Sequence, residues 1–289
     1  MYNIKESELV LSPDGSLYHI RMTGGQLADD VFLVGDPARV DMFKELFDSV
    51  DFESYNREIH AVTGFYRGHR FSAISTGMGC DNIDIVVSEL DAAANFDLVN
   101  RCLLPQRRHL NLIRIGTSGS LQTDIPCGSL VASYYAVGLD GLLNYYRHDD
   151  DLFEQMMNDS FIKHMGFDNR FAYPYSVKCD ESLYSQLAFD MVKGITVTAP
   201  GFYAPQGRHV RIAPSITGLN ESLASFQWDG VNVSNLEMET SAIYGLSRIM
   251  GHSALTVCLI IANRPEGKFL NSYHDEMRQT IVKILDRMV

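Results

Sequence analysis

The sequence predicts an α/β fold, in which helices cover a β-sheet. Short apolar runs of strand length alternate along the chain with amphipathic stretches of helix length. Hydrophobic residues make up 46% of the 289 residues, which is ample for a large core. Charged residues make up 21% and are spread evenly, and no repeat, low-complexity tract or linker divides the chain. We therefore expect a single domain over residues 1–289.

In the N-terminal half, apolar runs bounded by turn residues mark the strands. Asp36 and Pro37 follow the first run and fit the N-cap and first position of a helix. A second helix is expected from about Asp81 to Ala94. The expected strands are residues 31–34, 59–66, 70–75, 112–115 and 131–135. The second and third would form a hairpin, and the fourth would end in a turn, Gly116-Thr117-Ser118-Gly119.

In the C-terminal half, the stretch 144–180 is aromatic, acidic and weakly periodic, so we expect loops and short helices over one face. The expected strands are residues 195–198, 231–233 and 255–262. The expected helices are residues 183–192, a segment that ends near residue 250, and a segment from residue 272 onward. Apolar residues share one face of the last helix, namely Met277, Ile281, Leu285 and Met288.

Charge and cysteine content narrow the class of protein. The formal net charge of −12 argues against nucleic acid or an anionic membrane as the main partner, because both attract basic surfaces. The five cysteines are scattered and odd in number, as in a cytoplasmic protein with reduced thiols. The first ten residues lack the apolar core of a signal peptide, and the apolar run 255–262 is far shorter than the ~20 residues that span a bilayer. We expect a cytoplasmic protein without a membrane segment.

Three arginines stand where strands are expected to begin or end. Arg39 follows the first glycine turn, Arg57 precedes a strand, and Arg114 lies just ahead of the turn 116–119. In open α/β sheets ligands bind beyond the strand ends, where glycine turns let backbone N–H groups approach an anion and arginine matches phosphate geometry. Charge-assisted hydrogen bonds of this kind contribute roughly 1.5–3 kcal/mol each. Ordinary surface ion pairs beside ordinary turns are the alternative interpretation.

Two further groups of residues carry polar or aromatic chemistry. Glu237 and Glu239 flank Met238 at a strand-to-helix junction, where carboxylates could accept the hydroxyls of a sugar while the thioether packs under its ring. The same two acids could instead favour the start of a helix through its dipole. Phe202 could stack on a base that Gln206 and Arg208 hydrogen-bond, although an ordinary Gly/Pro loop with polar residues is the alternative.

Other catalytic motifs are missing from the sequence. It contains no H-E-x-x-H, no Walker G-x-x-x-x-G-K, no G-x-S-x-G and no complete dinucleotide-binding glycine pattern. The run 148–151 could suggest a metal, but an acidic surface loop is the better interpretation, and the other histidines lack ligand spacing. We therefore expect no metal site.

Seven stretches together resemble the nucleoside phosphorylase-I family, and within it the uridine phosphorylases. They occur in the family's order and extend from about residue 17 to the C-terminus, with the weakest likeness over 144–180. The stretches are LVGDPARV (33–40), NREIH (56–60), STGMGCDNI (75–83), LIRIGTSGSL (112–121), GFYAPQGR (201–208), NLEMETSA (235–242) and IIANRPEG (260–267).

The resemblance implies a central, mixed and partly barrel-like sheet surrounded by helices. It implies a dimer as the least functional unit, and three dimers could form a hexamer. The implied phosphate site consists of Gly35, Arg39, Arg114 and Thr117, with Arg57 reaching it from the neighbouring subunit. The implied ribose site consists of Met238 and Glu239, with His19 supplied across the dimer interface. The implied uracil site consists of Gly119, Phe202, Gln206 and Arg208.

The residues near the end of the last expected strand favour a pyrimidine. The purine branch of the family has an Asp there that protonates the leaving purine, whereas residues 261–264 read Ile-Ala-Asn-Arg. Uracil leaves with negative charge on its carbonyl oxygens, so donors such as Gln206, Arg208 and Arg264 suit it. Three positions depart from the family pattern: Ala38 in the glycine turn, residues 199–201 before Phe202, and Asn82. Asn82 stands where some bacterial relatives have a Ser that helps to bind potassium, so a monovalent cation site is doubtful even though Glu58 is retained.

The sequence thus predicts an enzyme that uses phosphate to cleave uridine reversibly to uracil and ribose 1-phosphate, without an organic cofactor. The residues expected to act in catalysis are Arg114, Gln206, Arg208 and Glu239. A purine nucleoside phosphorylase, a nucleosidase that uses water, and a non-catalytic nucleoside-binding domain are the alternatives.

Overall fold

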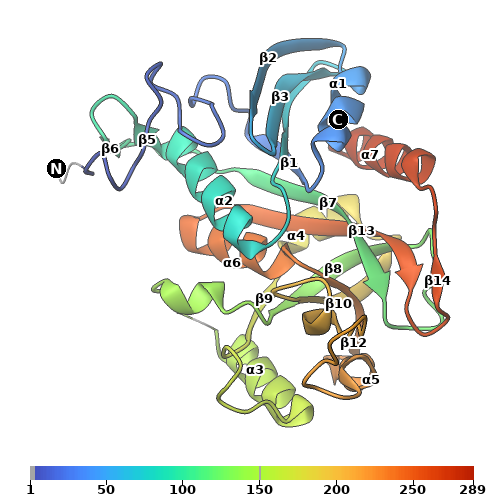
Figure 1. Cartoon of the computed structure of the whole chain (residues 1–289). Helices are drawn as coiled ribbons and strands as arrows, with labels where there is room; N and C mark the ends of the chain where they lie inside the picture. The colour runs from blue at the N-terminus through green and yellow to red at the C-terminus, as the bar shows by residue number, and fades with distance from the viewer. Residues whose placement is uncertain (1–3, 150) are drawn as a thin grey trace.

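The computed structural model describes residues 4–149 and 151–289. Residues 1–3 of the charged start and residue 150 of the acidic stretch lie outside the described residues. The centre of the molecule is a closed ring of five strands in the order β12-β10-β8-β13-β7, with β7 pairing back onto β12 (Figure 1). These strands are β7 Asn111–Ser120, β8 Leu130–Gly138, β10 Val192–Thr198, β12 Val231–Glu237 and β13 Ser253–Asn263. The expected mixed, partly barrel-like sheet is confirmed.

Outside the ring, the sheet continues from β7 through β1, β4, β3 and β2. Val31 of β1 pairs in parallel with Leu112 of β7, and β3 and β4 form the expected hairpin. The strands of this extension are β1 Asp30–Val34, β2 Ser49–Asn56, β3 Ile59–Tyr66 and β4 His69–Ser75. Short strands pair at the margins, with β9 on β8, β11 on β12 and β14 on β13, while β5 and β6 pair only with each other. Their bounds are β5 Phe96–Asp97, β6 Cys102–Leu103, β9 Tyr175–Lys178, β11 Gln227–Trp228 and β14 Lys268–Phe269.

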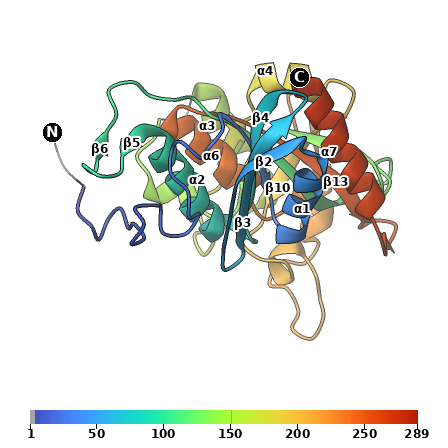
Figure 2. The same cartoon turned by 90° about the horizontal axis from the view of Figure 1, so that it is seen from above.

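Helices surround this sheet. Helices α2 and α6 pack side by side, whereas α7 runs against α4, α1 and β13 (Figures 1 and 2). The α-helices are α1 Pro37–Leu46, α2 Cys80–Asn95, α3 Leu152–Met165, α4 Glu181–Leu187, α5 Leu219–Ser225, α6 Thr240–Met250 and α7 His274–Met288. Two 3₁₀ helices are η1 Leu142–Tyr145 and η2 Ala204–Gln206. The expected apolar face of α7 is confirmed, because Met277, Ile281 and Leu285 are fully buried.

The segment 116–119 is not the turn that its glycines suggest. Strand β7 runs straight through it, because β13 pairs with β7 as far as Ser120 and β12 pairs with its last two residues. Gly116 is needed for another reason: a Cβ atom there would lie 3.2 Å from the guanidinium of Arg114. The glycine therefore makes room for the arginine. Thr117 and Gly119 are strand residues that pair with β13, and Gly119 also pairs with β12.

Two further expectations need correction. The helix expected over 183–192 is α4, which begins at Glu181 because Asp180 accepts hydrogen bonds from the N–H groups of Ser182 and Leu183 at 3.0 Å. It ends at Leu187, since the chain must enter β10 at Val192 and pair with β8. The stretch 144–180 holds the fourteen-residue helix α3 and strand β9 besides its loops.

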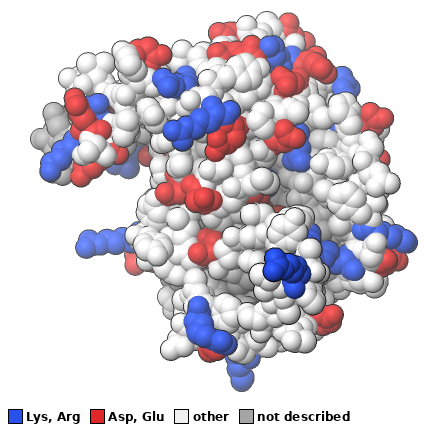
Figure 3. All heavy atoms as spheres, viewed as in Figure 1, with Lys and Arg blue, Asp and Glu red and all other residues white. Residues whose placement is uncertain are grey.

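In the described part of the chain, no helix is long and apolar enough to cross a membrane. On the face shown in Figure 3, lysine and arginine side chains are interspersed with aspartate and glutamate rather than gathered in one patch. The excess of acidic residues in the sequence therefore does not create a single acidic surface on this face.

Candidate active site

A cavity of about 550 Å³ opens where the carboxyl-terminal ends of β7 and β12 overlap. Both strands approach this point from opposite directions, and the overlap places Leu236 of β12 beside Gly119 of β7. Eleven of the residues expected from the sequence line the cavity: Gly35, Arg39, Arg114, Thr117, Gly119, Phe202, Gln206, Arg208, Glu237, Met238 and Glu239. The structure thus brings these eleven residues together from four separate stretches of the chain.

Arg114 is a buried residue of this cavity wall. Its Nη2 donates to Glu239 Oε2, and its Nε lies 3.6 Å from Glu237 Oε2. Burial lowers the pKa of Arg114, but the two carboxylates outweigh it and raise the pKa above its ordinary value, so the guanidinium stays charged. Two of its nitrogens, Nε and Nη1, are buried without a hydrogen-bond partner among the described residues. Unpaired buried donors are costly, so Nη1 points to a missing acceptor, whereas Nε faces the Glu237 carboxylate.

Glu237 is fixed by donors of the protein itself. Its carboxylate accepts from Thr198 Oγ1 at 2.6 Å, from the Glu239 N–H at 2.9 Å and from the Thr240 N–H at 2.9 and 3.1 Å. Burial, and then the negative charge of Glu239, raise the pKa of Glu237 to about 7 against the opposing attraction of Arg114. Of the two interpretations of this acid, the structure gives it the role at the start of α6, since its oxygens already accept the free N–H groups there.

Glu239 faces the cavity between two segments. Its Oε1 accepts the N–H of Gly79 at 2.8 Å, at the entrance to α2, and its Oε2 accepts from Arg114. Met238 beside it is half-buried, and its carbonyl accepts from the thiol of Cys80 at 3.2 Å. Burial raises the pKa of that thiol well above its usual range, and burial also raises the pKa of Cys258 to about 12. Neither cysteine near the cavity is therefore a nucleophile at neutral pH.

The first turn of α1 brings a second arginine to Arg114's end of the cavity. Asp36 Oδ1 accepts the N–H of Ala38 at 3.0 Å and starts the helix as expected. Arg39 then points inward, is largely buried, and donates from Nη2 to Thr117 Oγ1 at 3.4 Å. Two guanidinium groups, a hydroxyl and the glycine turn at Gly35 thus surround this end, an arrangement that suits a compact anion.

The other end of the cavity is formed by the loop around η2. Arg208 Nη1 donates at 2.5 Å both to Gln206 Oε1 and to the carbonyl of Phe202, and its guanidinium lies 3.7 Å from the centre of the Phe202 ring. Burial, and then the positive charge of Arg264, lower the pKa of Arg208 to about 10. A negatively charged group between these two arginines would relieve that repulsion.

Arg264 supports the same end from the turn that follows β13. Its Nη2 donates to the carbonyl of Gln206 at 2.9 Å, while its Nη1 is buried and has no hydrogen-bond partner among the described residues. Asn263 is engaged elsewhere, since its Nδ2 donates to the carbonyls of Gln122 and Ile125 at 3.0 Å and its Oδ1 accepts from Glu266. This end of the cavity therefore offers donors and an aromatic face.

Arg57 and His19 lie outside the cavity wall but close to each other. Arg57 is exposed in the turn between β2 and β3, with φ of +57°. The neighbouring Asn56 donates to the carbonyls of Tyr18 and His19 at 3.0 and 2.9 Å, and Glu89 holds the His19 ring through Nδ1 at 2.6 Å. Within one chain, neither Arg57 nor His19 lines the cavity.

The structure adds cavity residues that the sequence patterns did not single out. Most are apolar: Met78, Leu236, Ile261, Ala262 and Phe269. Phe269 lies on β14 and is 62% exposed, so it stands at the rim. Glu58 also lines the cavity. The sequence held one indication that Phe269 lies near the site. It stands two residues after the IIANRPEG stretch, in a segment that pairs back onto the end of β13.

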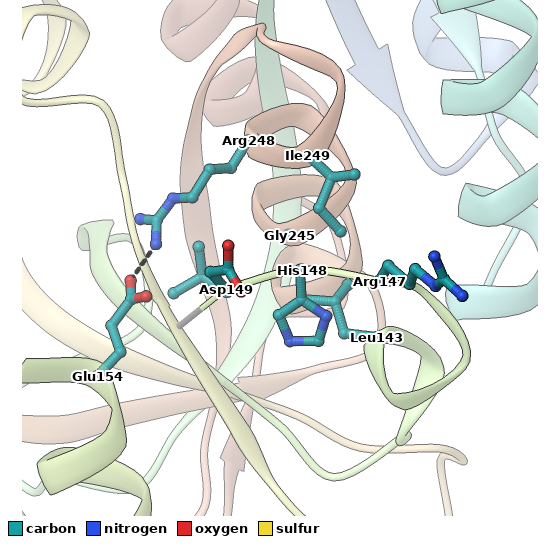
Figure 4. A pocket seen from close by; sticks show the side chains of 9 residues that line it. Leu143, Arg147, His148, Asp149, Glu154, Gly245, Arg248 and Ile249 are labelled. Carbon is teal, nitrogen blue, oxygen red and sulfur yellow. Dashed lines mark hydrogen bonds and ion pairs between the residues drawn. The ribbon is translucent and has the colours of Figure 1, made fainter. Parts of the chain in front are cut away.

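A second cavity, of about 250 Å³, lies at the far end of α6. Figure 4 shows Arg248 reaching from α6 to Glu154 of α3, while Arg147 turns away from them. No residue expected to bind substrate lines this cavity. Across residues 4–149 and 151–289, no group of three or more His, Cys, Asp and Glu side chains could hold a metal ion.

Comparison with known proteins agrees with this geometry. The family model described as "Phosphorylase superfamily" matches residues 29–289. A uridine phosphorylase of Thermococcus kodakarensis is 30% identical over 264 residues, covering 89% of this chain and 80% of the relative. A purine nucleoside phosphorylase of the DeoD type from Caldanaerobacter subterraneus is 28% identical over 84% of this chain and 86% of its own length.

A solved structure is similar over nearly the whole chain. The Trypanosoma brucei nucleoside phosphorylase, described as showing uridine phosphorylase activity, superposes with a TM-score of 0.85 at 28% identity, covering 97% of this chain and 98% of its own. The matched range and the similarity over most of the chain show that this chain belongs to the phosphorylase superfamily.

Proposed function

We propose that the protein catalyses the reversible, phosphate-dependent cleavage of uridine to uracil and ribose 1-phosphate. The observation that carries the proposal is the buried, unpaired Nη1 of Arg114 at the cavity wall. A buried donor left unsatisfied costs about 1–3 kcal/mol, and a phosphate oxygen would accept from Nη1, whereas Nε faces Glu237 at 3.6 Å. Arg39, Thr117 and Gly35 line the same end and would bind the remaining oxygens.

The cavity has room for a nucleoside beside this phosphate. Glu239 and Met238 lie between the two ends and would bind the ribose, so that phosphate attacks C1′ from the Arg114 side. No covalent nucleophile is required, and the two buried thiols have pKa values too high to serve as one. We likewise propose that the reaction needs no organic cofactor. Asn82 donates its amide to the Met78 carbonyl at 3.2 Å, which argues against a monovalent cation at this position.

The choice of uracil rests on the donors at the opposite end. As the glycosidic bond breaks, negative charge grows on the uracil oxygens, and Gln206 and Arg208 line the cavity where they would stabilise it. Arg264 does not line the cavity, but it donates to the Gln206 carbonyl and so supports this loop. A purine would need an acid at this position, whereas Asn263 is neutral and tied to backbone groups. The uridine phosphorylase names of similar proteins support the same choice.

We also propose that a dimer is the least functional unit and that three dimers could form a hexamer. Arg57 and His19 share one surface region through Asn56, where Tyr18 and Tyr55 are 36% and 63% exposed. Such aromatic exposure is typical of an interface. Across it, both residues would complete the partner's cavity. A cytoplasmic location is in keeping with five cysteines that are all free thiols.

The first prediction concerns phosphate. Wild-type protein should release uracil from uridine only when phosphate is present, and Arg39→Ala should raise the KM for phosphate at least about tenfold, or ~1.4 kcal/mol, with a much smaller change for uridine. Arg147→Ala, an exposed arginine at the second cavity, is the matched control and should leave both constants unchanged. Equal uracil release without phosphate would indicate a nucleosidase instead.

The second prediction concerns the base. Gln206→Ala should lower kcat/KM for uridine by at least about tenfold, because its amide would pair with both a carbonyl and the N–H of uracil. Arg208→Ala should lower it further, since charge grows on the base in the transition state. Cytidine and inosine should be poor substrates, and steady-state rates for the three nucleosides measure this. A preference for inosine would overturn the pyrimidine assignment while leaving the phosphate site standing.

The third prediction concerns the shared site. His19→Ala and Glu239→Ala proteins should each be nearly inactive, and exchange of subunits between them should restore part of the activity, because one cavity in each mixed dimer would then carry neither change. Native mass spectrometry would verify that mixed dimers form. Mixed dimers that stay inactive would show that His19 acts within its own chain or not at all.

A further inference from the structure

A line of buried hydrogen bonds leads from the cavity wall to a carboxylate that does not touch the cavity. Glu237 Oε1 accepts from Thr198 Oγ1 at 2.6 Å, and Thr198 Oγ1 in turn accepts the N–H of Ser241 at 3.0 Å. Ser241 Oγ then donates to Asp140 Oδ2 at 2.9 Å. Thr198, Ser241 and Glu237 are almost fully buried, so water does not compete for these bonds.

Asp140 is anchored firmly at the outer end of this line. It accepts from the Tyr175 hydroxyl at 2.8 and 3.0 Å and from the N–H of Leu142 at 2.8 Å. A Cβ atom on Gly138 would lie 2.4 Å from the Tyr175 ring and 2.7 Å from Asp140 Oδ2, so glycine is required there. Neither Asp140 nor Tyr175 lines the cavity.

The inner end of the line reaches Arg114. Ser241 is the second residue of α6, and the N–H groups at the start of α6 hold the Glu237 carboxylate. Glu237 lies 3.6 Å from Arg114 Nε, one of the two nitrogens without a protein partner. A shift of Ser241 would therefore move Thr198, the helix start and Glu237 together, and with them the direction of the unpaired N–H groups of Arg114.

We propose that Asp140 is a positioning residue for phosphate, which through Ser241, Thr198 and Glu237 holds Arg114 in the orientation that binds the anion. This inference rests on the proposed function, because it takes phosphate as the acceptor that Arg114 lacks. Asp140 does not line the cavity, so its effect on phosphate would pass through the orientation of Arg114. It also contacts the Cys80 thiol, whose hydrogen bond to the Met238 carbonyl leads to the proposed ribose site rather than to phosphate. Misplacement of a binding group by about 1 Å can reduce a rate by about a hundredfold, so a small rotation is enough.

A purely structural role for Asp140 predicts a different result. Asp140 would then only hold α6 against β9. Its loss would lower the free energy of unfolding without weakening phosphate binding more than uridine binding. The matched control is Glu154→Gln, which changes a buried carboxylate that anchors the other end of the same helix through Arg248 and accepts the N–H of Lys178 on β9 at 3.1 Å (Figure 4). Within the described chain, no hydrogen bond joins Glu154 to Glu237 or Arg114.

The experiment compares Asp140→Asn, Ser241→Ala and Glu154→Gln in the full-length protein, by steady-state kinetics and by calorimetric titration with inorganic phosphate. Asp140→Asn should raise both the KM and the Kd for phosphate at least about tenfold and change the KM for uridine less than about twofold. Ser241→Ala should do the same, and the double variant should add little, because both break one line. Glu154→Gln should lower the melting temperature without changing phosphate binding.

Fluorescence of Trp228, the single tryptophan, reports whether each variant is folded. Should Asp140→Asn fail to fold, Ser241→Ala decides the question. Equal changes in the KM for phosphate and in the KM for uridine, or an unchanged phosphate Kd in a folded variant, would overturn the inference. Wild-type protein that binds phosphate but does not cleave uridine would refute the proposed function alone, and the calorimetric comparison would still decide the role of Asp140. Wild-type protein that does not bind phosphate would refute both.

Discussion

The overlap of β7 and β12 at their carboxyl-terminal ends is the constraint on which the site depends. It closes the five-strand ring through Gly119 and Leu236, and it sets Arg114 against Glu237 and Glu239. Buried charges of this kind are stable only as a set, and removing one partner of a buried pair typically costs about 3–5 kcal/mol. The closure of the ring and the buried charge cluster therefore require each other.

The same cluster divides the cavity into regions of different chemistry. Glu237 is occupied by the start of α6, Glu239 is shared between α2 and Arg114, and Arg114 keeps Nη1 for a ligand. At the other end, burial and the positive charge of Arg264 lower the pKa of Arg208. Cationic donors thus lie at both ends, and the acidic acceptors lie beside Arg114. Such a distribution suits a substrate that bears negative charge at each end of a neutral sugar during the reaction.

Much of this could be predicted from the sequence, because the determining signals are local. Asp36 and Pro37 mark the start of α1, and the apolar runs mark β1, β3, β4, β8 and β13. The strand through 116–119 could not be predicted, since its glycines indicate a turn and only the distant strands β12 and β13 impose an extended conformation. The role of Glu237 stayed open for the same reason, because the path of the chain into α6 decides which acid meets the free N–H groups. The position of Arg57 near His19 could not be predicted either, because it depends on the side chain of Asn56, which donates to the His19 carbonyl.

A crystal structure of the wild-type protein grown with inorganic phosphate tests the central claim most directly. The account predicts one phosphate ion at the Arg39 end of the cavity, with an oxygen about 2.7–3.2 Å from Nη1 of Arg114, and with Glu237 still bound to the start of α6. A phosphate bound elsewhere, while Nη1 faces only water or turns towards another protein group, would contradict it.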